Sequence, residues 1–224
     1  MAGTQQGTFK SLTNLFKWLR VFFLIYIAGE ILIAIGAALM LSGGSSSFGP
    51  GLEISTGDMV YGIGGLILLL GLIVSIILFC IFSYRAVKNI KNFDRERIDT
   101  TPGWAVGWYF IPFANLFKPY GVMTDMWIAS VHQEKSNWET PGTMPIWWAC
   151  WILNNIISNF STRMGIESGG VWNEYASDVS LYKTTLNMDI AAAVFGVIAA
   201  WLLLGYTKRI ASAQDANLKA RAFE

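Results

Sequence analysis

The chain has 224 residues, of which 54% are hydrophobic and only 14% charged, and its net charge is +1. Soluble domains carry about 25% charged residues, so this composition predicts an integral membrane protein, and the length suits one domain over residues 1–224. A near-neutral charge gives no sign of a nucleic-acid partner. The single histidine excludes a histidine-cluster metal site such as that of catalytic zinc.

Long apolar runs account for most of the chain. Crossing a membrane takes about 20 apolar residues in a helix. Runs that meet this length lie at about 17–41, 59–84, 144–162 and 190–207. The sequence therefore predicts an all-α, polytopic membrane protein built as a bundle of four transmembrane helices.

The stretch between the second and third runs, residues 101–131, has a different pattern. It contains two apolar pieces, 104–111 and 120–131, and each is too short to cross a membrane alone. The residues that interrupt them, and that form a candidate site, are Pro112, Asn115, Lys118 and Pro119. Proline breaks a helix, and irregular backbone at membrane depth must be satisfied by protein or water. We therefore expect a broken helical segment, re-entrant or interfacial, with Asn115 at its turn bonding the freed backbone groups.

The outer loop before the last apolar run carries an amphipathic pattern. Aromatic and aliphatic residues recur there at spacings of three and four, at Trp172, Tyr175, Val179, Tyr182 and Leu186. This predicts an outer amphipathic helix, which either lies on the membrane surface or runs straight into the fourth span. A docking surface for a partner is the alternative.

The basic residues predict the topology. With both termini and residues 85–143 in the cytoplasm, 14 of the 16 lysines and arginines are cytoplasmic, and only Arg163 and Lys183 are outside. The reverse orientation would leave two inside, against the usual excess of basic residues in cytoplasmic loops. Both ends of the broken segment then lie on the cytoplasmic side.

Glu30 is the one charge inside the first run beyond Lys17 and Arg20, which stand at its start. It lies ten residues beyond Arg20, or about 15 Å along a helix, which is near the bilayer midplane. Polar residues expected at a similar depth are Ser75, Asn154 and Asn155. These groups could hydrogen-bond Glu30 and hold the helices together, or they could line a proton or ion path or a substrate site.

Small and aromatic residues complete the pattern. Ala192, Gly196 and Ala200 form a small-residue face, which favours close helix packing within the chain or between chains. Glycines that could do the same in the second run are Gly62, Gly64, Gly65 and Gly71. The pairs Trp104/Trp108 and Trp147/Trp151 are typical of interface anchors, with an aromatic pocket for a lipid or quinone-like ring as the alternative.

The chain lacks the common catalytic motifs. It has no nucleophile elbow, phosphate-binding loop, dinucleotide fingerprint, zinc motif or haem attachment motif. We therefore expect neither an enzyme nor a cofactor or metal site. An enzyme would need a pocket at the broken segment that joins Asn115, Lys118 and Asp125.

The middle of the chain resembles a known family over residues 84–159. The matching stretches read RAVKNIKNF, TPGWAVGWYFIPFANLFKPYGVMTDMWIAS and IWWACWILNNII. They are similar to the bacterial membrane proteins grouped as domain of unknown function 4328. The resemblance implies a multi-span protein of the bacterial inner membrane and supplies no activity.

These observations lead to two expectations of function. The first is a non-enzymatic accessory, scaffold or assembly subunit, in contact with membrane lipids and with another copy of itself or a membrane-protein partner. The alternative is a small channel or transporter with its polar site around Glu30.

Overall fold

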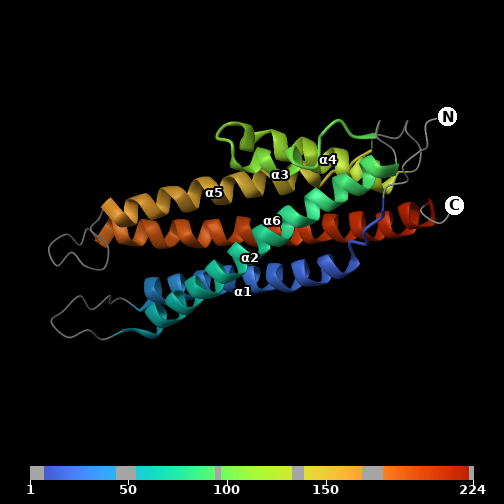
Figure 1. Ribbon diagram of the computed structural model, residues 1–224. Helices are drawn as coiled ribbons and strands as arrows, with labels where there is room; N and C mark the ends of the chain where they lie inside the picture. Colours follow the sequence, from blue (N-terminus) through green and yellow to red (C-terminus); the bar gives the residue numbers. More distant parts are fainter. Residues whose placement is uncertain (1–7, 44–53, 94–96, 133–138, 168–178, 222–224) are drawn as a thin grey trace, which may run out of the picture. The chain divides into compact units, whose positions relative to one another are not determined.

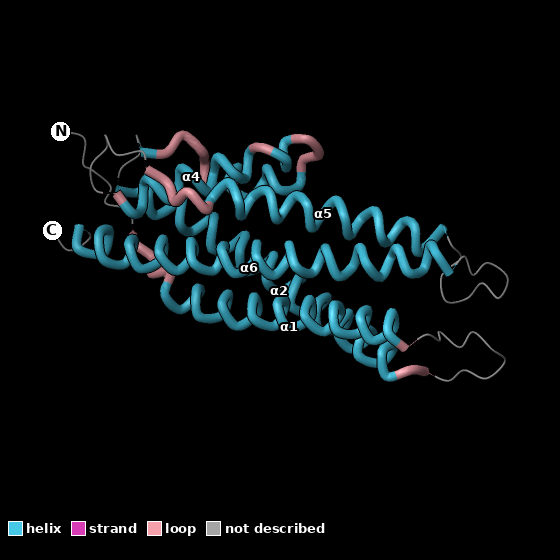
Figure 2. Tube along the Cα trace, turned by 180° about the vertical axis from the view of Figure 1, so that it is seen from behind, coloured by secondary structure: helices cyan, strands magenta, loops and turns pink. Residues whose placement is uncertain are grey.

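The structure is a computed structural model that describes residues 8–43, 54–93, 97–132, 139–167 and 179–221. All regular elements in these ranges are helices, which confirms the all-α prediction for them (Figures 1 and 2). In chain order they are α1 (Thr13–Ser42), α2 (Thr56–Phe93), α3 (Trp104–Gly107), the 3₁₀ turns η2 (Trp108–Phe110) and η3 (Ala114–Leu116), α4 (Lys118–Val131), α5 (Met144–Glu167) and α6 (Val179–Arg221).

Among the described residues, three helices are long and apolar enough to cross a membrane. They cover Thr13–Ser42, Thr56–Phe93 and Ser180–Asn217, and so contain the first, second and fourth expected spans. The third expected span, 144–162, lies within α5, which has the length of a spanning helix but is not among the three. Its tryptophans and asparagines lower its mean hydropathy, so a fourth span stays a prediction.

The helix ends differ from the expected runs in two places. Helix α2 continues through the basic stretch after the apolar run and ends at Phe93. Helix α6 begins at Val179, so the described part of the amphipathic pattern, which includes Tyr182 and Leu186, runs straight into the expected fourth span. Trp172 and Tyr175 lie outside the described residues.

The described chain forms two compact units. The first contains residues 1–22, 74–144 and 202–224, and the second contains residues 23–73 and 145–201. In the first unit, α2, α4 and α6 share a buried polar network. The side-chain amide of Gln214 donates to the hydroxyl of Ser130 at 2.9 Å, and Asn89 donates to the amide oxygen of Gln214 at 3.0 Å. Buried polar groups that bond one another in this way fix the contact between helices.

In the second unit, glycines let α1 and α2 approach closely. A Cβ atom on Gly29 would lie 2.5 Å from the backbone nitrogen of Leu68, and one on Gly64 would lie 2.8 Å from that of Ile33. Gly36 and Gly71 meet backbone atoms of the other helix in the same way. The contact partners run in opposite directions along the two helices, so the pair is antiparallel. Each helix therefore packs on its neighbour through small residues spaced seven apart.

Candidate functional site

Glu30 is the centre of a polar cluster in the second unit. Its side chain is buried, with 6% of its surface exposed. One turn earlier on α1, the hydroxyl of Tyr26 donates to Oε1 of Glu30 at 2.5 Å. The side-chain amide of Asn154 on α5 also hydrogen-bonds to Glu30 and donates to the carbonyl oxygen of Ala192 on α6 at 2.8 Å. A single amide thus links α1, α5 and α6.

Gly196 provides the space for this arrangement. A Cβ atom there would lie 2.5 Å from Oε1 of Glu30 and 2.8 Å from Nδ2 of Asn154. The small-residue face of α6 therefore packs within the chain at this position, against polar side chains from two neighbouring helices. Ala192 and Ala200 on the same face are also buried.

A second carboxylate, Asp189 on α6, belongs to the same unit. Its Oδ2 accepts a hydrogen bond from the hydroxyl of Tyr61 on α2 at 2.7 Å, and its Oδ1 accepts one from Ser161 on α5 at 2.7 Å. Asp189 also acts electrostatically on Glu30. We refer to these residues as the polar cluster: Tyr26, Glu30, Tyr61, Asn154, Ser161 and Asp189.

The expected partners of Glu30 are only partly present in this cluster. Asn154 bonds Glu30, whereas the amide of Asn155 donates to the carbonyl oxygen of Trp151 on its own helix at 2.7 Å. Ser75 belongs to the first unit, where it is buried and its hydroxyl bonds no described residue.

Sequence reasoning missed the rest of the polar cluster. Tyr26 had a usable signal, since it precedes the buried carboxylate by four residues and so shares its helix face. Asp189 stands directly before the apolar run 190–207, a position typical of a residue that flanks a span. Tyr61 and Ser161 carry no signal in the sequence, because only tertiary packing brings them to Asp189.

The polar cluster can act chemically in two ways. Hydroxyl and amide donors that hold two carboxylates among apolar helices can fix the helix contacts. Carboxylates and hydroxyls inside a membrane protein also occur along the paths by which protons move in pumps and transporters.

The broken segment lies in the first unit and is interrupted at residues 111–117. Phe113 has a φ of 64°, a left-handed conformation that is rare for a residue with a side chain, and it follows Pro112. Lys118 and Pro119, which were expected to interrupt the apolar pieces, instead form the first turn of α4. Proline fits there because the first N–H groups of a helix have no partner within it.

Asn115 does not satisfy the freed backbone as expected. It lies in η3, near the turn, but its Oδ1 is buried and has no hydrogen-bond partner among the described residues. The backbone bonds itself instead, since the N–H of Asn115 donates to the carbonyl oxygen of Ile111 at 3.0 Å.

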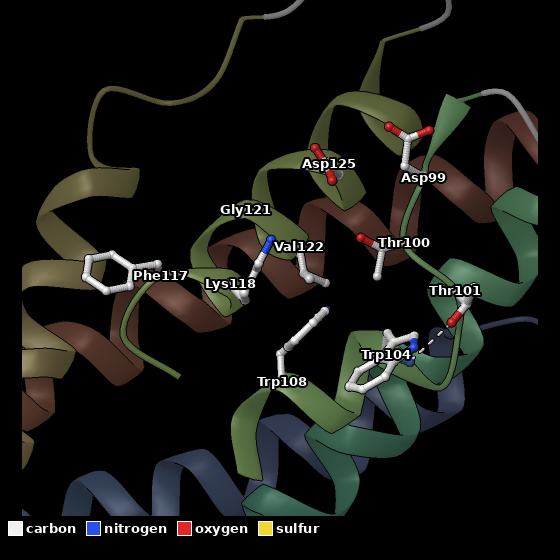
Figure 3. Close-up of a pocket in the computed structure, with 10 residues that line it drawn as sticks. All are labelled: Asp99, Thr100, Thr101, Trp104, Trp108, Phe117, Lys118, Gly121, Val122 and Asp125. Carbon is white, nitrogen blue, oxygen red and sulfur yellow. Dashed lines mark hydrogen bonds between the residues drawn. The ribbon is translucent and has the colours of Figure 1, made fainter. Parts of the chain in front are cut away.

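An open pocket of about 560 Å³ lies beside the broken segment (Figure 3). This volume falls within the range of small-ligand sites, roughly 300–1,000 Å³. Its lining residues come from the 99–125 stretch and are Asp99, Thr100, Thr101, Trp104, Trp108, Phe117, Lys118, Gly121, Val122 and Asp125. The pocket joins Lys118 and Asp125, but Asn115 is not among the residues that line it.

Aromatic and charged groups face each other in this pocket. The rings of Trp104 and Trp108 are stacked with centroids 4.4 Å apart, and Nζ of Lys118 lies 5.3 Å from the ring centroid of Trp108. Burial raises the pKa of Asp125, and the nearby carboxylate of Asp99 raises it further. Within the described residues, no group of three or more metal-binding side chains occurs here or elsewhere.

Comparison with known proteins settles the family. The family model described as "Domain of unknown function (DUF4328)" matches residues 50–212. The chain belongs to this family. Searches of the curated proteins and of the solved structures gave no match. The match includes α2, the broken segment, α5 and most of α6, and it begins after Glu30.

Proposed function

We propose that the protein is a four-span integral membrane protein of the bacterial inner membrane that works without catalysis, as an accessory, scaffold or assembly subunit. Helix α5 supplies the additional span. Its support is that Asn154 and Ser161 of α5 bond polar groups on helices that are themselves candidate spans. A helix bonded in this way to a carboxylate near the midplane belongs at the same depth.

The burial and hydrogen bonding of Glu30 are the observation that carries this proposal. Its carboxyl group is buried, bonded from Tyr26 and Asn154, and seated against Gly196. The described pocket is lined by residues 99–125 and includes no member of the polar cluster. A carboxylate whose neighbours are bonding partners is typical of a group that holds helices together. The subunit would contact membrane lipids and another copy of itself or a membrane-protein partner.

A small channel or transporter is the second candidate, and Asp189 is the observation that favours it. Glu30 and Asp189 lie in one unit and interact electrostatically, and hydroxyl groups bond each of them. Transport would need protons or ions to reach both carboxylates from the two sides of the membrane.

The adjacent asparagines of α5 provide a matched test. Asn154→Ala removes bonds to α1 and α6, whereas Asn155→Ala removes only a bond to its own helix. Hydrogen bonds between membrane helices contribute about 1 kcal/mol, so we expect Asn154→Ala to lower the thermal unfolding midpoint in detergent measurably more than Asn155→Ala.

Stability and proton-flux measurements on the same purified protein distinguish a structural role from transport. For a subunit held together by the polar cluster, Glu30→Gln should retain stability and Glu30→Ala should lose it, because glutamine keeps an acceptor for the Tyr26 hydroxyl. Proteoliposomes containing the wild type should show no more proton flux than empty liposomes. Flux that is abolished by both Glu30→Gln and Asp189→Asn, in folded protein, would instead establish the transporter.

A further inference from the structure

The pocket beside the broken segment contains two carboxylates and one ammonium group, and these opposite charges lie in different parts of it. Figure 3 shows the carboxylates of Asp99 and Asp125 at one end and the indole rings of Trp104 and Trp108 at the other, with Lys118 between them. Within the described part of the chain, no side chain hydrogen-bonds either carboxylate. The anionic end is therefore open to a ligand.

This charge pattern selects among ligands. Lys118 would repel a simple cation, and the two carboxylates would repel a simple anion. A ligand with an ammonium group next to a phosphate satisfies both, because its charges are separated in the same order as those of the pocket. A primary ammonium also has N–H donors for carboxylate oxygens, and such charge-assisted hydrogen bonds are the strong ones.

The rim of the pocket is apolar and exposed. Phe117 lines the pocket and is 73% exposed, and Trp104 on the other side is 48% exposed. Phe110 and Phe113, at the break, are 68% and 83% exposed. Exposed apolar side chains at a pocket, such as Phe117 and Trp104, favour a membrane or an apolar ligand. A ligand that enters here meets hydrocarbon next to charge.

We propose that this pocket binds a phosphate-linked primary amine, the chemistry of an aminophospholipid headgroup. The ammonium lies at Asp99 and Asp125, and the phosphate lies at Lys118 next to the hydroxyl of Thr100. The stacked indoles form the wall, and Phe117 and Trp104 contact the acyl chains of a lipid. This inference concerns the first unit and does not depend on the proposed role of the polar cluster.

Titration of the full-length protein in detergent with short-chain lipids tests the proposal. The probes are the dihexanoyl forms of phosphatidylethanolamine, phosphatidylcholine and phosphatidylglycerol, and soluble phosphoethanolamine, which has no acyl chains. Binding of each probe is measured by isothermal titration calorimetry. We expect phosphatidylethanolamine to bind about tenfold more tightly than phosphatidylcholine, because the methylated ammonium has no N–H donors. Phosphatidylglycerol, which has no amine, should not saturate the site.

Substitutions assign the binding to this pocket. Asp125→Asn and Asp99→Asn should each weaken phosphatidylethanolamine binding by about tenfold, since each removes a charged acceptor. Asp58→Asn, which removes a carboxylate in the other unit, is the matched control and should bind like the wild type. Lys118→Gln should weaken both phosphatidylethanolamine and phosphoethanolamine.

The relative affinities of these probes decide whether the proposal holds and which ligand source it favours. Tighter binding of the lipid than of phosphoethanolamine supports the proposal and identifies the membrane as the source, while equal binding supports the same headgroup chemistry in a soluble ligand. Equal affinity for phosphatidylglycerol and phosphatidylethanolamine would overturn the proposal. So would wild-type affinity in folded Asp99→Asn and Asp125→Asn proteins.

Discussion

Individual polar residues in this protein differ in whether their bonds join helices. Asn154 bonds α1 and α6, and Asn155 next to it bonds only α5. A sequence pattern cannot separate these two roles, because adjacent residues on a helix point about 100° apart and the neighbours on each side are unknown. The contribution of a buried polar residue to stability depends on its hydrogen-bond partner. Predictions for single residues therefore follow from the hydrogen bonds in the structure.

Asn115 illustrates the opposite case, a polar atom without a partner. Leaving a buried acceptor unsatisfied costs roughly 1–3 kcal/mol of stability, so removing it should cost nothing and can help. We expect Asn115→Leu to leave the free energy of unfolding unchanged or to raise it by about 1 kcal/mol. The measurement is the denaturation midpoint in detergent. A loss of more than about 1 kcal/mol would show that the amide bonds the backbone of the turn after all.

Asp125 should make stability depend on pH. Its pKa is raised in the folded state by burial and by Asp99, so folded protein binds the proton more tightly than unfolded protein. Stability should therefore fall as pH rises from the usual aspartate range, near 4, through the raised pKa. Asp99 opposes the charge of Asp125, while Lys118, the other charged group that lines the pocket, favours it.

Asp125→Asn should accordingly raise the thermal midpoint at pH 8, with a gain that shrinks as the pH is lowered toward 4. Asp99→Asn removes the second cause that raises the pKa of Asp125, so stability should fall over a narrower pH range. A gain for Asp125→Asn that is equal at every pH would contradict this account.

At the scale of elements, glycine geometry decides how closely helices approach. Gly64 of α2 meets the backbone of α1, whereas a Cβ atom on Gly65 would have nothing within 4 Å. The sequence identified both as candidate packing residues, but it could not say which of two adjacent glycines faces the neighbour.

Replacing each of these glycines by alanine gives a matched comparison. Gly64→Ala puts a methyl group against backbone that cannot rotate away, and overpacking of this kind costs about 1–3 kcal/mol. Gly65→Ala has open space and gains up to about 1 kcal/mol from the better helix propensity of alanine. Thermal midpoints in detergent should therefore shift in opposite directions. Equal shifts would show that α1 and α2 do not pack through these glycines.

Much of the helical architecture could be predicted, because apolar length alone specifies a spanning helix. The runs at 17–41, 59–84 and 190–207 fall inside α1, α2 and α6. The prolines also placed a break in the 101–131 stretch. They could not give its limits, because a proline interrupts a helix in the interior but starts one in the first turn, as Pro119 does in α4. The left-handed Phe113 has no sequence signal, since a bulky aromatic residue disfavours that conformation.

At the scale of the whole molecule, the two compact units divide the basic residues. The residue ranges of the first unit contain 14 of the 16 lysines and arginines, and those of the second contain only Arg163 and Lys183. This division repeats the one made by the predicted topology, in which only Arg163 and Lys183 lie outside the cytoplasm.

Single cysteines at exposed lysines test this topology. Lys118, Lys183 and Lys208 are all exposed, and the first and third belong to the first unit while Lys183 belongs to the second. In a background without Cys80 and Cys150, we expect a membrane-impermeant maleimide to label Lys183→Cys in intact right-side-out spheroplasts. Lys118→Cys and Lys208→Cys should react only after the membrane is opened, because the predicted topology puts both on the cytoplasmic side.

The three positions distinguish the ways in which this topology could be wrong. Labelling of Lys208→Cys but not Lys183→Cys in intact spheroplasts would reverse the orientation of the whole chain. Labelling of Lys118→Cys together with Lys183→Cys, while Lys208→Cys stays protected, would mean that residues 101–131 cross the membrane. The number of spans would then have to change, because α5 could no longer begin on the cytoplasmic side. If α5 and α6 both cross the membrane, protection of Lys118→Cys alongside Lys208→Cys means that α4 does not cross, so the broken segment returns to the side from which it enters.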